Sequence, residues 1–298
     1  MNYITSKNTT HGKDIKLFYQ DIGEGQPVIF IHGWPMSHEM WEYQVYELAL
    51  SGLRCISYDR RGFGKSSKPL GGYDYDTMAD DLASIIDNLS LSNVVLVGFS
   101  MGGGEVARYL GKYGADKVSK VILVASVTPY LLKAKDNPRG GLSFEDLTGM
   151  IEGVKNDRIG FLAEFGKHFF GINLLHHAIS TPLLEYYRML GSFASPVATM
   201  DCIKAFGQTD FRADMAAFTV PTLVIHGDSD KIVPVEISGQ VAHEMIPGSQ
   251  FVTYDNAPHG LFYTHRQRLN RDLYSFINNQ PLQQEEAVIL PSNQPLVV

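Results

Sequence analysis

Three residues that lie far apart in the sequence have the types needed for nucleophilic catalysis: Ser100, Asp228 and His259. A serine hydroxyl is a weak nucleophile unless a histidine accepts its proton and a carboxylate orients that histidine. Each of the three residues comes shortly after a run of apolar residues. We therefore predict that they form a catalytic triad at the place where those runs end.

The serine lies in the stretch LVGFSMGGG, residues 96–104. A flexible loop is the simpler interpretation of so many glycines. However, a buried strand precedes Ser100 and a helix-like stretch follows it, which is the context in which G-x-S-x-G forms a sharp strand-to-helix turn. Gly98 and Gly102 then flank the serine because such a turn leaves little room for side chains. The pattern indicates a nucleophile above a helix N-terminus, whose free N–H groups suit a developing oxyanion.

Two neighbouring aspartates in the segment VIHGDSDKIVP are candidates for the acid of the triad, Asp228 and Asp230. Asp228 is closer to the end of the preceding strand and follows a glycine that permits a turn, so we predict Asp228. Asp230 could instead cap the helix expected to begin near Pro234. His259 follows the last strand in the short loop NAPHG, and we predict it as the general base rather than an ordinary surface histidine.

The oxyanion formed during acyl transfer needs two N–H donors. We predict the backbone N–H of Met101, next to the nucleophile, as one donor. The segment IHGWP supplies the other from Trp34, since Pro35 has no N–H. The Trp34 indole is also expected to wall the substrate pocket, a role compatible with core packing. We expect His32 to orient this loop without being catalytic.

These residues must be positioned by the elements around them. Short apolar runs alternate with helix-like stretches, which predicts a mostly parallel sheet covered by helices on both faces. An earlier segment, residues 15–23, alternates in polarity and predicts an antiparallel start. The predicted strands are residues 27–33, 54–59, 93–98, 120–125 and 221–227, with a weaker one at 250–255, and the predicted helices include 76–89 and 104–114.

The alternation stops between about residues 126 and 219, where only helical patterns occur, and this stretch is too long for a loop. We predict an α/β core formed by residues 1–127 and 218–280, with residues 128–217 as a helical cap. The polar, proline-containing residues 281–298 are predicted to be a mobile tail. Within or beside the cap, Phe161, Phe165 and Tyr130 are expected to line the pocket with Trp34. Such an apolar pocket favours uncharged acyl groups.

Other clusters are assigned structural roles. His168, His176 and His177 have poor spacing for a metal site and no cysteine nearby, so we expect them to pack on the cap or the surface and predict no bound metal. The segment DRRGFGKSS, residues 59–67, lacks the spacing of a phosphate-binding loop. We expect it to be a structural turn held by Asp59.

Composition excludes several classes of function. A formal charge of −7 argues against binding to nucleic acid, which needs a basic face. Two cysteines are too few for a disulfide framework, and Cys55 lies in an apolar run typical of a buried, inert thiol. No uninterrupted apolar run approaches the ~20 residues that span a membrane. Because residues 1–16 contain no apolar core typical of a secretory signal, we expect a cytoplasmic protein without membrane partners.

Taken together, the motifs FIHGWP, YDRRGFGKSS, GFSMGGGEVARY, HGDSDKIVP and NAPHG resemble those of the α/β-hydrolase superfamily, and especially its cofactor-free haloperoxidase and arylesterase branch. The resemblance covers about Lys13 to Phe276, whereas the tail after about Gln280 departs from the usual end of these proteins. It implies the α/β-hydrolase fold, with a mostly parallel central sheet, helices on both faces and a helical cap insertion.

The same resemblance implies a serine hydrolase that cleaves small carboxylic esters through an acyl-enzyme, without a metal, haem or other cofactor. Its partners would be small-molecule esters, or a carboxylic acid plus hydrogen peroxide, which yields a peracid able to oxidise bromide or chloride. Hydrolases of lactones, amides or C–C bonds, and a receptor on the same scaffold, remain alternatives. Haloalkane dehalogenases and epoxide hydrolases are disfavoured because they carry aspartate where Ser100 stands. The oligomeric state stays open, a homo-oligomer included.

Overall fold

The computed structural model of the protein describes residues 2–173 and 178–282. Its centre is an eight-stranded sheet with the order β1-β2-β4-β3-β5-β6-β7-β8. The pairs β1–β2 and β2–β4 are antiparallel and the remaining pairs are parallel, which confirms the predicted fold class and its antiparallel start. The strands are β1 (Tyr3–Thr5), β2 (Lys16–Ile22), β3 (Gln26–Ile31), β4 (Leu53–Tyr58), β5 (Val94–Phe99), β6 (Val118–Val124), β7 (Thr222–Gly227) and β8 (Gln250–Tyr254).

Helices pack on both faces of this sheet. Two separate clusters of buried apolar residues result, one with α2 and α3 and one with α1 and α9. The helices are α1 (Glu42–Leu50), α2 (Tyr75–Asn88), α3 (Met101–Tyr113), α4 (Phe144–Phe169), α5 (Thr181–Ser192), α6 (Pro196–Gln208), α7 (Gly239–Met245), α8 (Leu261–Thr264) and α9 (Arg266–Ile277), with 3-10 turns η1 (His38–Trp41), η2 (Asp214–Ala217) and η3 (Val235–Ile237).

Burial on both faces explains the near-continuous apolar character of the strands. Successive side chains of a strand point to opposite faces. In β3, Ile29 and Ile31 belong to the cluster with α2 and α3, whereas Val28 and Phe30 belong to the cluster with α1 and α9. Neither set of side chains reaches solvent, so both sets are apolar and the strand shows no alternation of polar and apolar residues.

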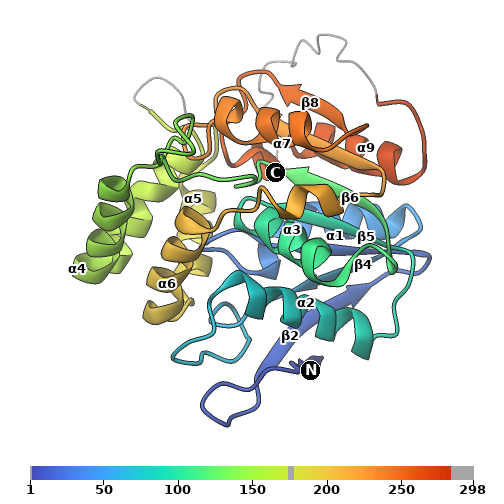
Figure 1. The fold of residues 1–298 in the computed structure, drawn as a ribbon, viewed down its shortest axis with the longest axis horizontal. Coiled ribbons are helices and arrows are strands. Elements are labelled where there is room, and N and C mark those ends of the chain that lie inside the picture. The colour runs from blue at the N-terminus through green and yellow to red at the C-terminus, as the bar shows by residue number, and fades with distance from the viewer. Residues whose placement is uncertain (1, 174–177, 283–298) are drawn as a thin grey trace, which may run out of the picture.

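The predicted helical insertion corresponds to α4, α5 and α6, which fall between β6 and β7 and are grouped on the left of the sheet in Figure 1. Asp157 interrupts α4 with a non-helical backbone, and its carboxylate accepts the N–H of Gly160 at 2.9 Å, as a helix cap does. The limits of the predicted cap and core remain predictions, and residues 283–298 of the predicted tail lie outside the described residues. None of the described helices is long and apolar enough to cross a lipid bilayer.

The glycines after the serine pack closely instead of forming a loop. The helix α3 begins at Met101, so Gly102, Gly103 and Gly104 form its first turn, three residues before the predicted start. A Cβ atom on Gly102 would lie 2.4 Å from the carbonyl oxygen of Ile31 in β3. These glycines therefore allow α3 to approach the sheet more closely than any side chain would permit.

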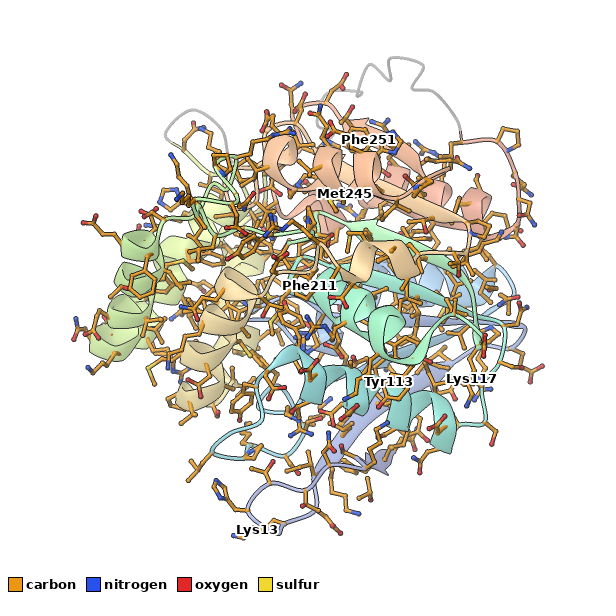
Figure 2. All side chains as sticks on the ribbon, in the orientation of Figure 1. Lys13, Tyr113, Lys117, Phe211, Met245 and Phe251 are labelled. Carbon is orange, nitrogen blue, oxygen red and sulfur yellow. The ribbon has the colours of Figure 1, made fainter. Side chains whose placement is uncertain are left out.

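The same close packing continues around the start of α3. Phe211, labelled in Figure 2, is fully buried, and its ring meets that of Tyr75 edge-on at 4.7 Å between centroids. A Cβ atom on Gly104 would lie 2.6 Å from the Phe211 ring. The segment that precedes β7 thus packs directly against the helix that follows the serine.

We expect Gly102→Ala to lower the free energy of unfolding by about 1–3 kcal/mol, because the new methyl group would meet a backbone oxygen that cannot rotate away. Gly149→Ala is the matched control, since a Cβ atom there meets nothing within 4 Å. Removing that glycine from α4 should stabilise the protein by up to about 1 kcal/mol. Urea unfolding of the three proteins measures both effects. A Gly102→Ala protein as stable as the native one would contradict the packing argument.

Candidate active site

Ser100 occupies the sharp turn between β5 and α3. Its backbone has φ 53° and ψ −118°, a conformation that costs energy for any residue other than glycine and is found at functional sites. The turn is held by a hydrogen bond from the Ser100 N–H to the Val124 oxygen at 2.9 Å and by one from the Gly103 N–H to the Ser100 oxygen at 3.0 Å. The predicted strand-to-helix turn is therefore present, with the serine side chain directly before the helix.

The structure brings His259 to the serine. The His259 Nε2 atom lies 2.9 Å from the Ser100 Oγ atom, within hydrogen-bond distance. The imidazole is buried, with its ring centroid 5.0 Å from that of Phe99 and 4.8 Å from that of Phe169. These two rings leave the histidine little freedom to turn away. Its position agrees with the role predicted for it.

The predicted acid, Asp228, is wrong: the carboxylate that contacts His259 belongs to Asp230. The Asp230 Oδ2 atom lies 2.6 Å from His259 Nδ1, and the side chain is buried. Asp228 is exposed, and its Oδ1 atom accepts the backbone N–H of Asn256 at 2.7 Å. Asp228 thus holds the loop that precedes the histidine and does not touch the histidine itself.

The turn after β7 explains this correction. The strand ends at Gly227, and the backbone of Asp230 turns back toward it, with 3.4 Å between the Asp230 nitrogen and the Gly227 oxygen. The Asp230 Oδ1 atom accepts the N–H groups of Ile232 and Val233 at 2.9 and 2.8 Å. Since the carboxylate folds over its own turn, it does not cap the next helical segment, η3, which has no side-chain cap.

The surroundings of Asp230 favour its ionised form. Burial by itself would raise the pKa of this carboxyl group. The neighbouring charge of His259, together with hydrogen bonds from His226 and His259, outweighs burial and holds the pKa well below its ordinary value. The group is therefore a carboxylate at neutral pH, as needed to stabilise a positively charged imidazole.

The loop expected to supply an oxyanion donor lies beside the nucleophile. A Cβ atom on Gly33 would be only 3.1 Å from the Ser100 Cβ atom. The Met36 N–H bonds to the Gly33 oxygen at 3.0 Å, and the Trp34–Pro35 peptide is cis. The Trp34 N–H is thus carried by a tight turn next to the serine, and Met101 is the first residue of α3. Their role as donors stays a prediction.

His32 holds this turn through both ring nitrogens. Its Nε2 atom accepts the Arg60 N–H at 3.0 Å, so the Nδ1 atom, 2.9 Å from the Gly33 oxygen, carries the proton and donates it. Burial, with the charge of Arg60, lowers the pKa of His32 well below its ordinary value. Because the Gly33 carbonyl and the Trp34 N–H belong to one planar peptide, this bond also sets the direction of the N–H. The geometry agrees with the orienting role expected for His32.

A buried ion pair also contacts the turn that carries His32 and Gly33. Arg60 and Glu105 are both fully buried, and the Arg60 Nε atom lies 2.7 Å from Glu105 Oε2. Arg60 also donates from Nη2 to the His32 carbonyl oxygen at 2.8 Å, and Tyr58 donates to Glu105. The pair therefore ties α3, which follows the nucleophile, to the strand end that carries the oxyanion loop.

The line of Asp230, His259 and Ser100 opens into a cavity of about 610 Å³. Trp34, Phe161 and Phe165 line this cavity, and the Trp34 indole donates to the Thr199 oxygen of α6 at 3.0 Å. The two phenylalanines come from α4, so the helical insertion forms part of the wall. An apolar chamber thus lies directly in front of the serine.

Tyr130, the other residue predicted to line the pocket, is not part of the cavity wall. The guanidinium carbon of Arg212 lies over its ring, 5.2 Å from the ring centroid, and Tyr130 is not among the residues that line the cavity. Arg212 also forms an ion pair with Asp136 at 2.6 Å. The prediction for Tyr130 is therefore wrong.

Sequence reasoning also missed most of the aliphatic wall. These residues are scattered over several segments, and no local pattern marks them as pocket residues. Exposed titratable side chains lie among them, His168 included, and His176 and His177 are outside the described residues. The aliphatic lining includes Val127, Leu131, Leu142, Met150, Val233 and Ile237, and the charged lining includes Asp146, Glu164 and Lys231.

A second cluster, His38, Glu39 and Asp59, has side chains of types that bind metals, with ligand atoms within 4.8 Å of one another. The Asp59 carboxylate already accepts the His38 N–H at 2.8 Å, the His38 Nδ1 proton at 2.7 Å and the Lys65 N–H at 2.8 Å. Asp59 thus holds the turn as predicted. Burial lowers the pKa of His38, but hydrogen bonds to Asp59 and Glu39 outweigh it and raise the pKa to about 9.

Comparisons with known proteins show the family that this chain resembles. A family model described as the alpha/beta hydrolase fold matches residues 26–266. A putative non-heme chloroperoxidase of Synechocystis sp. is 42% identical over 278 residues, covering 93% of this chain and all of the relative. A bifunctional esterase/perhydrolase of Acinetobacter calcoaceticus is 36% identical, covering 94% and 100% of the two chains. The crystal structure of a bromoperoxidase from Bacillus anthracis superposes with a TM-score of 0.89 at 47% identity, covering 93% and 100%.

We expect Asp230→Asn to slow the reaction of Ser100 with a fluorophosphonate probe by about a hundredfold or more, because an amide stabilises the imidazolium poorly and favours the wrong tautomer. Asp228→Asn is the matched control. It makes the same chemical change two residues away on an exposed side chain and should alter labelling by no more than about twofold. Labelling rates followed by mass spectrometry decide between the two aspartates. Slow labelling of Asp228→Asn alone would refute the assignment.

We expect His38 to contribute stability that depends on pH. Its folded pKa of about 9 exceeds its ordinary value of 6.5, so the contribution is complete below pH 6.5 and is lost as pH rises through 9. The native protein should therefore lose about 3 kcal/mol of its stability advantage over His38→Gln between pH values below 6.5 and above 9. Urea unfolding at both ends of the range measures the loss. His168→Gln, on an exposed side chain, serves as control, and an advantage independent of pH would contradict the ion pair.

Proposed function

The chain belongs to the α/β-hydrolase family, and we propose that it is a serine hydrolase that cleaves small carboxylic esters through an acyl-enzyme. The observation that carries this proposal is the continuous line of hydrogen bonds from Asp230 through His259 to Ser100, which ends at an apolar cavity. Relatives named as esterases, perhydrolases and non-heme haloperoxidases support it.

Acylation of the serine uses the three side chains in sequence. His259 Nε2 takes the proton from Ser100 Oγ while the oxygen attacks the ester carbonyl carbon. The negative charge that develops on the carbonyl oxygen is stabilised by the backbone N–H groups of Met101 and Trp34. His259, held by Asp230, then gives its proton to the departing alcohol, and the acyl group stays on Ser100.

Deacylation repeats these steps with a second nucleophile. A water molecule gives its proton to His259 and attacks the acyl-enzyme, releasing the carboxylic acid and restoring Ser100. Hydrogen peroxide can replace water, in which case the O–O bond stays intact and the product is a peracid. The peracid then oxidises bromide or chloride in solution and is itself reduced to the acid. This perhydrolysis accounts for haloperoxidase activity by Ser100 chemistry.

The cavity sets the range of substrates. We assign residues 128–217 as a cap whose helix α4 contributes Phe161 and Phe165 to the wall facing the serine. A volume of about 610 Å³ with this apolar lining suits uncharged acyl groups of small to medium size.

We place the reaction in the cytoplasm.

We expect Ser100→Ala to reduce hydrolysis of p-nitrophenyl acetate by about a thousandfold or more, with chelator present throughout. Peroxide-dependent bromination in acetate buffer should fall with it, since both reactions pass through the same acyl-enzyme. Ser229→Ala, which removes an exposed hydroxyl outside the hydrogen-bonded line, is the control and should retain activity.

Three results would change the proposal. Equal ester turnover by the native protein and Ser100→Ala would show that Ser100 is not the nucleophile. Bromination that survives the substitution would separate haloperoxidation from the acyl-enzyme. A native protein that neither hydrolyses esters, lactones or amides nor reacts with a fluorophosphonate would favour a receptor on the same scaffold.

A further inference from the structure

A second buried histidine, His226, contacts the acid of the triad. It lies in β7, near the end of the strand, and its side chain has no exposed surface. The His226 Nε2 atom is 2.7 Å from the Val233 carbonyl oxygen and 3.3 Å from Asp230 Oδ2. The mechanism described above does not use this residue, although it touches the same carboxylate oxygen as His259.

The contacts of His226 define where its proton sits. A carbonyl oxygen can only accept a hydrogen bond, so the Nε2 atom must carry the proton. That N–H is shared between the Val233 oxygen and the Asp230 carboxylate. The Nδ1 atom has no hydrogen-bond partner among the residues that the structure describes. The ring therefore contributes a single N–H donor. Both acceptors of that donor lie in the turn that contains Asp230.

With this donor, both oxygens of Asp230 are held on two sides. Two backbone N–H groups hold Oδ1, and the two histidines hold Oδ2. We propose that His226 is a positioning residue for catalysis, whose Nε2–H fixes the Asp230 oxygen that faces His259 and closes the turn from Asp230 to Val233. This inference rests on the proposed function, because it concerns the acid of that reaction.

The packing around the ring keeps this donor in place. A Cβ atom on Gly239, at the start of α7, would lie 2.5 Å from His226 Nδ1 and 3.0 Å from its Cγ. The backbone at Gly239 therefore rests against the ring and blocks its rotation. Simple core packing could be provided by an apolar side chain without leaving Nδ1 buried and unpartnered, a cost that the Nε2 contacts offset.

Loss of the donor should act on the reaction in a defined direction. The titratable groups around Asp230 are His259 and His226, which touch it, and Asp228 and Lys231, which are exposed neighbours in sequence. Without the His226 N–H, more of the carboxylate charge acts on His259 and stabilises its protonated form. The acidic limb of the pH–rate profile should then move to higher pH by about half a unit. Looser positioning should also lower kcat by about tenfold, with little change in KM.

The test compares His226→Leu with His226→Gln. Leucine has a similar size and no donor, whereas glutamine can place an N–H near the position of Nε2. We expect His226→Leu to show the shifted acidic limb and the lower kcat with p-nitrophenyl acetate, and His226→Gln to recover the native limb and most of kcat. Urea unfolding of each variant separates these effects from a loss of stability, which alone would not move the limb.

Native pH profiles in His226→Leu would overturn the inference, as would equal losses in both variants without a shift of the limb. Should His226→Leu fail to fold, Gly239→Ala provides the second route, because its methyl group displaces the ring and should shift the limb in the same direction. Failure of the proposed function looks different: the native protein and Ser100→Ala would then hydrolyse the ester equally. Ser100-dependent turnover with an unshifted limb in both His226→Leu and Gly239→Ala overturns the role of His226 alone.

Discussion

The close approach of the first turn of α3 to the ends of β3 and β5 is the constraint on which the rest of this site depends. Backbone atoms of Gly102 lie so close to the Ile31 carbonyl that no side chain fits between them. This contact lets Ser100 take its positive φ, because the surrounding backbone holds the turn in a conformation that an isolated serine would avoid. It also places the start of α3, with its free N–H groups, directly behind the nucleophile.

Buried polar groups then maintain the geometry that packing has created. Arg60 and Glu105 lie in the core, where an unpaired charge would be very costly, and they are retained because each has several hydrogen-bond partners. The same principle applies to Asp230, whose oxygens each accept two donors. These buried polar side chains therefore fix the orientation of the hydrogen-bonding groups of His32, Gly33 and Trp34. Apolar packing supplies most of the free energy of folding.

The topology determines which groups come from the sheet and which come from the insertion. Parallel strands end at one edge of the sheet, so loops after β3, β5, β7 and β8 meet there and bring the reacting groups together. The described residues of the insertion between β6 and β7 contribute no group to the hydrogen-bonded line of Asp230, His259 and Ser100. They supply aromatic and aliphatic surface to the cavity wall. The hydrogen-bonded line thus lies at strand ends, and α4, with Phe206 of α6, contributes much of the cavity wall in front of it.

The sequence by itself determined the sheet, its alternating helices and the positions of Ser100 and His259 at the ends of strands. Those features are encoded locally, by apolar runs of strand length, by glycines around Ser100 and by a histidine in a short loop after the last strand. Even the start of α3 differed by only three residues, because the same glycines serve in a loop and in a tightly packed helix.

Only the tertiary structure decided which aspartate contacts His259. Asp228 and Asp230 differ by two positions in one turn, and the path of that turn depends on hydrogen bonds and on packing against β8 and His226, none of which has a local pattern. The same reason applies to the cavity. Its aliphatic wall is assembled from distant segments, and Tyr130 instead packs against Arg212, a partner 82 residues further along the chain. Distant contacts of this kind arise from the folded arrangement of the chain and leave no spacing that a sequence can display.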